Sequence, residues 1–204
     1  MHYARGMART VDQHRYHERR NAILQEAHRQ FSASGFDRTT TASICRGAGI
    51  SSGTFFHYFP TKLDALIGLL ASGAEATVRQ LALIEQQQKG VDAILAYVKA
   101  FENELTDPSY SGFVHAIAGV EQVPEVAGVL LDEARATSEF ITRNLAIAQE
   151  HGTIRDDVPV DRLAVWVRWL FDGAAQSAAE TITVEAGGLA DAVRALLGSP
   201  ARTD

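Results

Sequence analysis

The sequence predicts an all-α protein with a small three-helix head (residues 17–62) and a larger helical body (residues 63–204). Strand signals are nearly absent, because β-branched residues are scattered and no segment alternates apolar and polar residues between hairpin turns. Apolar residues instead recur at helical spacing along most of the 204 residues. Glycine, proline and capping residues stand between these segments, where helices would end and begin.

The head begins after a segment that we expect to be a flexible arm, residues 1–16. Its first helix carries apolar residues at helical spacing and would stop at a glycine: Ile23, Leu24, Ala27, Phe31 and Gly35. Thr40 and Ser51 would cap the second and third helices, with Gly49 between them. Pro60 ends the third helix, and Thr61 would cap the next.

Longer helices are expected in the body. They run to about residue 88, then over residues 91–105, 111–120, 124–151, 161–179 and 189–197, with breaks at Gly90, Asp107-Pro108, Pro124 and the loop 152–159. In the helix over 161–179, apolar residues surround most of the circumference. Such a helix must be covered on two sides.

Charge is divided unevenly along the chain. The whole sequence has a net charge of -6, but residues 1–66 hold nine Lys/Arg against five Asp/Glu, a net of +4. The remaining residues hold ten against twenty, a net of -10. A basic N-terminal part can meet DNA phosphates while an acidic body stays off the duplex, although a chance asymmetry would look the same.

Several classes of protein are disfavoured by composition. No run approaches the roughly 18 uninterrupted apolar residues of a membrane helix, and the N-terminus lacks a secretory signal, so we expect a cytoplasmic protein without a membrane partner. The single cysteine, Cys45, excludes an internal disulfide and a thiolate metal cluster. We expect no metal and no cofactor, and we interpret Cys45 as a small core residue rather than a redox sensor.

Residues 39–66 carry most of the functional information. Two short helices joined by a tight turn need a residue that tolerates positive φ, here Gly49, and an apolar plug, here Ile50. A small core would combine Ile23, Ala27, Phe31, Ile44, Ala48, Ile50, Phe56 and Phe59. The opposite face of the third helix would present Ser52, Gly53, Thr54, His57 and Tyr58, short or flat polar groups that fit a major groove about 12 Å wide. This pattern predicts a helix-turn-helix DNA reader.

The same stretch closely resembles the TetR family of transcriptional regulators. The resemblance rests on Phe31-x-x-x-Gly35-Phe36, Thr40-Thr41, Ala48-Gly49-Ile50-Ser51 and the run from Gly53 to Lys62. It is strong over about residues 17–66; beyond them only helix lengths and the loop Gly152-Thr153-Ile154-Arg155 are similar. Cys45, Gly47 and Phe56 depart from the family's usual pattern.

The resemblance implies a set of DNA contacts. Thr41, Tyr58 and Lys62 would hold phosphates, Ser52, Thr54, Phe55 and His57 would lie against bases, Arg46 is a further base candidate, and Thr40, Ser51 and Gly53 complete the set. Two alternatives remain open: Phe55 belongs to the core, or His57 is merely solvated. The arginines Arg5, Arg9, Arg15, Arg19 and Arg20 form either a DNA-binding arm or an unstructured tail.

One reading helix contacts few base pairs, so a homodimer on a palindrome is expected, with its two heads about 34 Å apart. Dimerisation is assigned to Trp166, Trp169, Leu170, Gly173, Ala174, Ser177, Leu189, Val193 and Leu196, which suit a twofold four-helix bundle. The alternative is that the helix over 161–179 is central to a monomer.

The resemblance also implies that the body binds a small apolar or amphipathic ligand. The candidates are Tyr97, Phe101, Phe113, His115, Ile117, Phe140 and Trp166, with His115, Glu121 or Arg168 as polar anchors. For each of them core packing is the alternative.

These expectations combine into a repressor that leaves its operator when the ligand binds. An enzyme finds little support, because the sequence has no Gly-x-Gly-x-x-Gly after a strand, no phosphate-binding loop, no His-Glu-x-x-His and no serine elbow, and we expect no catalytic residues. A helical interaction module that senses nothing is the other alternative.

Overall fold

The computed structural model describes residues 3–180 and 187–198, with side chains from residue 13 onward, and these residues form helices without strands. The helices are α1 (Tyr3–Arg38), α2 (Thr41–Ala48), α3 (Ser52–Tyr58), α4 (Lys62–Gln87), α5 (Val91–Leu105), α6 (Tyr110–Ala118), α7 (Pro124–Glu150), α8 (Val160–Ala179) and α9 (Gly188–Leu197). The all-α prediction is confirmed.

The predicted capping residues begin the three helices of the reading segment. Thr40 Oγ1 accepts the Ser43 N–H at 3.0 Å, Ser51 Oγ accepts the Thr54 N–H at 3.1 Å, and Thr61 Oγ1 accepts the Asp64 N–H at 3.1 Å. Gly49 ends α2 in the left-handed conformation, with φ 64°. These local hydrogen bonds satisfy backbone donors that a helix start leaves free.

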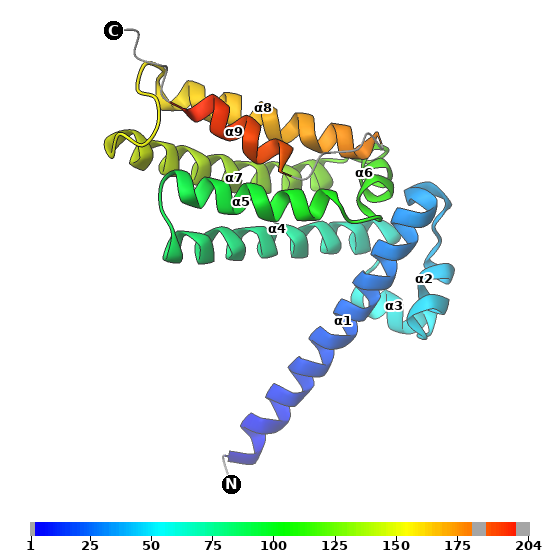
Figure 1. The fold of residues 1–204 in the computed structure, drawn as a ribbon. Helices are drawn as coiled ribbons and strands as arrows, with labels where there is room; N and C mark the ends of the chain where they lie inside the picture. Colours follow the sequence, from blue (N-terminus) through cyan, green and yellow to red (C-terminus); the bar gives the residue numbers. More distant parts are fainter. Residues whose placement is uncertain (1–2, 181–186, 199–204) are drawn as a thin grey trace, which may run out of the picture.

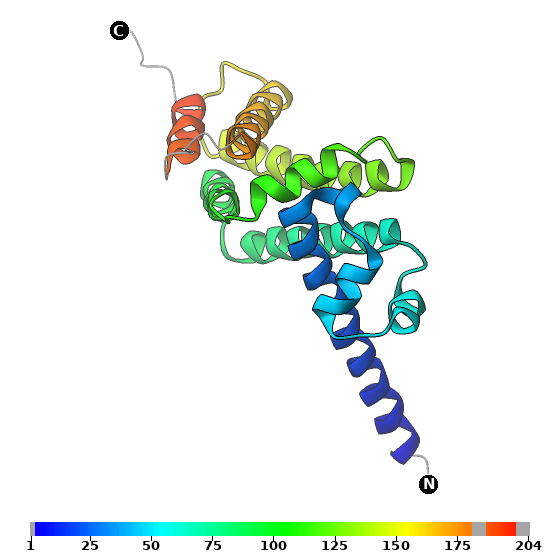
Figure 2. The same cartoon turned by 90° about the vertical axis from the view of Figure 1, so that its right-hand side faces the viewer.

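The expected flexible arm is instead part of α1, which extends back to Tyr3. No proline interrupts residues 1–38, and alanine and arginine, which favour helices, are frequent there. The N-terminal half of α1 therefore continues as one helix, which projects away from the rest of the molecule (Figures 1 and 2). Gly35 adopts a positive φ of 77° inside the last turns, where the sequence predicts the end of this helix.

The body is a bundle in which α4, α5, α7, α8 and α9 run side by side, with α8 and α9 on the side away from α4 (Figure 1). Its core joins these helices through buried side chains that include Ile94, Phe140, Leu163, Val193 and Leu197. The head packs against one end of this bundle, where α6 lies across α1 (Figures 1 and 2).

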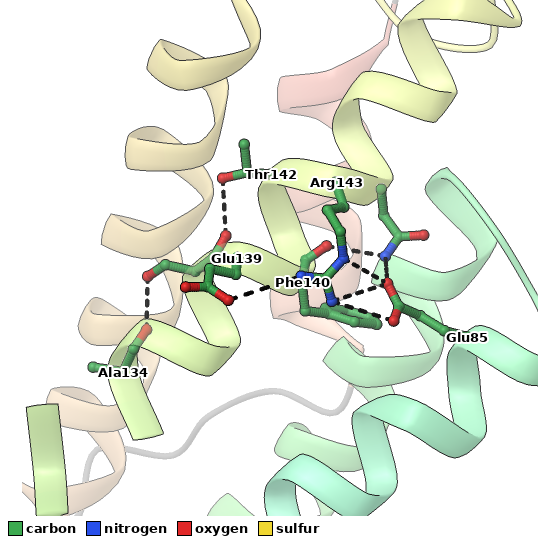
Figure 3. A network of polar contacts seen from close by, with 8 residues as sticks. Glu85, Ala134, Glu139, Phe140, Thr142 and Arg143 are labelled. Atoms are coloured by element: carbon green, nitrogen blue, oxygen red, sulfur yellow. Dashed lines mark hydrogen bonds and ion pairs between the residues drawn. The ribbon is translucent and has the colours of Figure 1, made fainter. Parts of the chain in front are cut away.

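A polar network joins α7 to α4 at the other end of the bundle (Figure 3) and also holds the α4–α5 turn. Arg143 of α7 pairs with Glu85 of α4 at 3.2 Å. The buried Asn144 donates to Glu85 Oε1 and to the Phe140 carbonyl, and its Oδ1 accepts the N–H of Gly90 in the α4–α5 turn. Because each buried polar group has a partner, the network holds the turn without an unsatisfied donor.

A second core crosses the predicted division between residues 62 and 63. It combines Ile23, Phe31 and Phe55 of the head with Ala116 of α6 and Val126 of α7. The domain division remains a prediction, but any movement of α6 must act on the head through this shared core.

Among the described residues, one helix, α4, is long and apolar enough to cross a membrane by length and composition. A single helix of this kind is weak support for a membrane protein, since core helices of soluble proteins meet the same criterion. In this structure α4 packs against α1, α5 and α7.

Candidate nucleic-acid interface and body cavity

The outer face of α2 and α3 presents most of the predicted DNA-contacting residues. Thr40, Arg46, Ser51, Ser52, Gly53 and His57 are exposed, and Thr41, Thr54 and Tyr58 are half-buried. Among the described residues, the side chains of Arg46 and Ser52 make no hydrogen bond or ion pair, so their donors are open to a ligand. The hydroxyls of Thr54 and Ser51 are less available to a ligand, because their oxygens lie 2.9 Å apart and Ser51 also caps α3.

The burial predicted for the two adjacent phenylalanines of α3 is reversed in the structure. Phe55, a candidate base contact, is fully buried, whereas Phe56, a candidate core residue, is 51% exposed. The reason is the spacing: Phe55 and Phe59 are four residues apart, lie on one face of α3, and approach each other with ring centroids 5.9 Å apart. Phe56 is therefore the aromatic side chain that α3 offers to a partner.

Lys62, a predicted phosphate contact, is engaged by main-chain carbonyls of its own chain. Its Nζ lies 2.6 Å from the Phe36 carbonyl, 2.9 Å from that of Thr39 and 3.4 Å from that of Asp37, above the Phe36 ring. An ammonium has three hydrogens, and these carbonyls account for all of them. As placed, Lys62 joins the start of α4 to the end of α1, and its expected phosphate contact stays a prediction that would require these hydrogen bonds to be exchanged.

Replacement of Lys62 by methionine should therefore act on stability rather than on DNA charge. We expect the free energy of unfolding to fall by about 1–3 kcal/mol, because a charged donor to partly buried carbonyls is lost. Urea unfolding measures this change, and Arg46→Met, at an exposed unpaired arginine, is the control that should leave it unaltered. A Lys62→Met protein of normal stability, whose DNA affinity depends less steeply on salt by about one charge, would restore the phosphate role.

A groove of about 950 Å³ lies between α1 and the reading segment. Its α1 wall includes Arg15, Tyr16 and Arg19, and its other wall includes His57 and Tyr58. Tyr16 contacts Tyr58 with ring centroids 4.7 Å apart, a contact that the sequence did not indicate. The side chains of Arg5 and Arg9 lie outside the described residues.

The body contains two adjoining hollows, of about 500 Å³ and 340 Å³, here together named the body cavity. Both are lined by Thr77, Gln80, Glu104, Tyr110 and Glu133. The larger hollow also touches the head through His28 of α1, whose ring lies 4.6 Å from that of Phe113 of α6. Volumes of this size are within the range of small-molecule sites, about 300–1,000 Å³.

Three of the seven predicted ligand residues line this cavity: Tyr97 and Phe101 the smaller hollow, and Phe113 the larger. The other four do not. Phe140 is wholly buried in the core, Ile117 and Trp166 pack against the two cores, and His115 is exposed, with Nδ1 2.7 Å from the Ser111 carbonyl. Aromatic residues on body helices thus divide between core and cavity, and their sequence spacing alone did not separate them.

The cavity also has acidic side chains, Glu104 and Glu133, which were not among the predicted ligand residues. Glu104 follows Tyr97 and Phe101 at helical spacing, so a carboxylate in line with an apolar stripe was the available signal. Desolvation raises the pKa of Glu104, and repulsion from Glu133 and Asp107 adds to this. Desolvation also raises the pKa of Tyr110 to about 12. No group of three or more His, Cys, Asp or Glu side chains that could hold a metal occurs in the described part of the chain.

The predicted dimerisation residues differ in accessibility. Trp169 and Gly173 are exposed, and Trp166, Leu170, Ala174, Ser177 and Leu196 are half-buried. Leu189 and Val193 are buried, because α9 turns them into the core of its own subunit. As placed, their side chains do not face a second copy, so this arrangement does not support the expectation that they form the dimer contact.

Comparison with known proteins identifies similar regulators. Residues 23–67 match the family described as bacterial regulatory proteins, tetR family. The transcriptional regulator UidR of Escherichia coli is 27% identical over 186 residues, which cover 88% of this chain and 91% of that protein. The transcriptional repressor AcnR of Corynebacterium diphtheriae is 23% identical, with 76% of this chain and 78% of that protein covered.

Solved structures agree with these relatives in fold. The regulator FadR of Bacillus subtilis, in complex with stearoyl-CoA, has a TM-score of 0.70 at 15% identity, and the match covers 86% of this chain and 96% of that one. The similar proteins are regulators of transcription and not enzymes.

Proposed function

We propose that this chain, a member of the TetR family of DNA-binding transcriptional regulators, is a cytoplasmic repressor. It would bind a palindromic operator as a homodimer and would leave the operator when a small molecule binds. The observation that carries the proposal is the capped helix α3, whose exposed side presents Ser52, Phe56 and His57 from a rigid head. Each side chain would stand in the major groove, where base edges differ.

Charge supports the same orientation on DNA. Residues 1–66 carry the excess of basic side chains, and Arg46 stands exposed at the last turn of α2. The acidic body would be kept away from the phosphates, so affinity should fall steeply with salt. Lys62, by contrast, stabilises the reading head through its contacts with main-chain carbonyls at the end of α1.

An uncovered face of α8 supports the homodimer. Val165 and Trp169 are 47% and 64% exposed. Gly173 lies on the same face, because residues 165, 169 and 173 follow one another at intervals of four along the helix. A second copy related by a twofold axis would cover the same face on both subunits. A Cβ added at Gly173 would meet no atom within 4 Å, so close approach of another helix is open there.

The body cavity supports release by a ligand. Its larger hollow is bounded by α1, α4, α5, α6 and α7, so an occupant would touch His28 of the head and Phe113 of α6 together. A ligand that fits one arrangement of α6 and α1 better than another would shift the spacing of the two heads. FadR, a protein of similar fold, is described in complex with stearoyl-CoA.

Selection of bound sequences from a random DNA pool tests the proposal. We expect a palindrome whose half-sites are separated by about one helical turn or a multiple of it. Enrichment of no sequence over competitor at moderate salt would refute the repressor assignment, and enrichment of a lone half-site would refute the dimer.

A further inference from the structure

The body cavity has aromatic walls. In the smaller hollow the rings of Tyr97 and Phe171 stack with centroids 5.3 Å apart, and Phe101 lies 5.0 Å from Phe171. Tyr110 borders both hollows, and Phe113 borders the larger. Ring faces carry partial negative charge and attract cations as well as apolar groups.

Carboxylates line the same hollows as these rings. Glu133 Oε1 accepts the Thr77 hydroxyl at 2.6 Å, and Glu104 lies at the exposed rim shared by both hollows. Asp107 borders the larger hollow, and two hydrogen bonds from Ser109 lower its pKa and keep it ionised. The walls therefore hold Glu104, Asp107 and Glu133, besides Asp172, which is paired with Arg168. The mutual repulsion of the first three is unfavourable unless a positive charge lies among them.

Basic groups do not balance them. The lining residues include no lysine, and the one arginine among them, Arg168, donates to Asp172 Oδ1 at 2.8 Å. His28 is the remaining basic group of the lining, and desolvation lowers its pKa against the opposing charge of Asp107, which favours its neutral form. An anionic ligand would meet uncompensated carboxylates, and a positive one would relieve their repulsion.

We propose that the body cavity takes an organic cation with an apolar or aromatic body, held by Glu104, Glu133 and the surrounding ring faces. This inference rests on the proposed ligand-released repressor and specifies the chemistry of its ligand. Desolvated cation–π contacts and the two carboxylates would both favour a delocalised cation over a neutral molecule of the same shape.

Two ions of the same shape and opposite charge test whether the cavity prefers a positive or a negative ligand. Titration calorimetry of the full chain with tetraphenylphosphonium should show saturable binding, and tetraphenylborate should bind at least about tenfold more weakly, a difference of about 1.4 kcal/mol. Equal or tighter binding of the borate ion, or no binding of the phosphonium ion, would overturn the proposal.

Charge removal at constant shape tests the residues. The double variant Glu104→Gln/Glu133→Gln keeps an acceptor for Thr77 and should bind tetraphenylphosphonium about tenfold more weakly, with the preference over tetraphenylborate lost. Asp132→Asn removes a charge beside Glu133 but at an exposed position paired with Arg135, and it should bind as the native chain does. Glu104→Gln alone, at the exposed rim, gives an intermediate loss without touching the core. Native affinity in the double variant would refute the assignment.

The outcome separates this inference from the proposed function. Calorimetry is performed on protein without DNA, so cation binding is measured whether or not an operator exists. A specific operator with no cation preference would refute only the ligand class, and cation binding without any specific operator would refute only the repressor.

Discussion

Replacing Gly112 by alanine is expected to lower the free energy of unfolding by about 1–3 kcal/mol and to displace α6 from α1. A Cβ at this position would lie 2.1 Å from the Ser32 carbonyl oxygen and 3.0 Å from its carbon. Main-chain atoms cannot rotate away as a side chain can, so one of the two helices must move. Because α1 carries the head and α6 borders the body cavity, operator affinity should change together with stability.

A matched glycine separates this clash from the general effect of adding a methyl group. Gly128 lies inside α7 with nothing within 4 Å of its Cβ position, and Gly128→Ala should stabilise by up to about 1 kcal/mol. Ser32→Ala should not rescue Gly112→Ala, since the clash is with the Ser32 main chain. Urea unfolding of the three proteins measures the difference. A Gly112→Ala protein as stable as Gly128→Ala would show that α6 and α1 separate freely.

The helix boundaries of the head could be predicted because their causes are local. Thr40, Ser51 and Thr61 each accept a backbone N–H three residues ahead, and Gly49 supplies the positive φ of the turn. Such interactions need no knowledge of the rest of the fold. The helical state of the arm was missed for the opposite reason: nothing in residues 1–16 marks a helix start, and helix propensity alone continues α1 through them.

The uncertain assignments within the reading segment depend on tertiary packing. Phe55 and Phe56 are equally apolar; the four-residue spacing of Phe55 and Phe59 indicated the buried face, and the shared core of the head, which includes Ile23 and Phe31, buries Phe55. Lys62 matches a family motif, but its environment depends on the turn after Gly35, which aims three carbonyls at its ammonium group. A one-dimensional pattern does not distinguish a phosphate from a carbonyl as the acceptor.

The cavity was the least predictable part. Its walls come from several helices, so a lining residue such as Glu133 has no neighbour in sequence that reveals its partner Thr77, 56 positions away. Core and cavity aromatics look alike until packing places Phe140 inside and Phe101 at the wall. Sequence spacing could assign both residues to buried faces of helices and no further.

The Trp169→Glu variant is expected to sediment as one chain and to bind operator at least about 100-fold more weakly, equivalent to about 2.8 kcal/mol. Trp169 is the most exposed large apolar side chain among the described residues, at 64%. Tryptophan side chains at interface centres commonly contribute more than about 2 kcal/mol. In a twofold interface one substitution acts twice, and each new carboxylate would be buried near its symmetry mate.

Leu83→Glu provides the control, because Leu83 is similarly exposed, at 56%, but lies on α4, away from α8. It should sediment as two chains and keep native operator affinity, since the same charge is added outside the contact. If Trp169→Glu also remains two chains at micromolar concentration, a different face joins the subunits. If it becomes one chain but keeps full affinity for a palindrome, a single head suffices for recognition, and pairing of the bodies cannot be what a ligand alters to release the DNA.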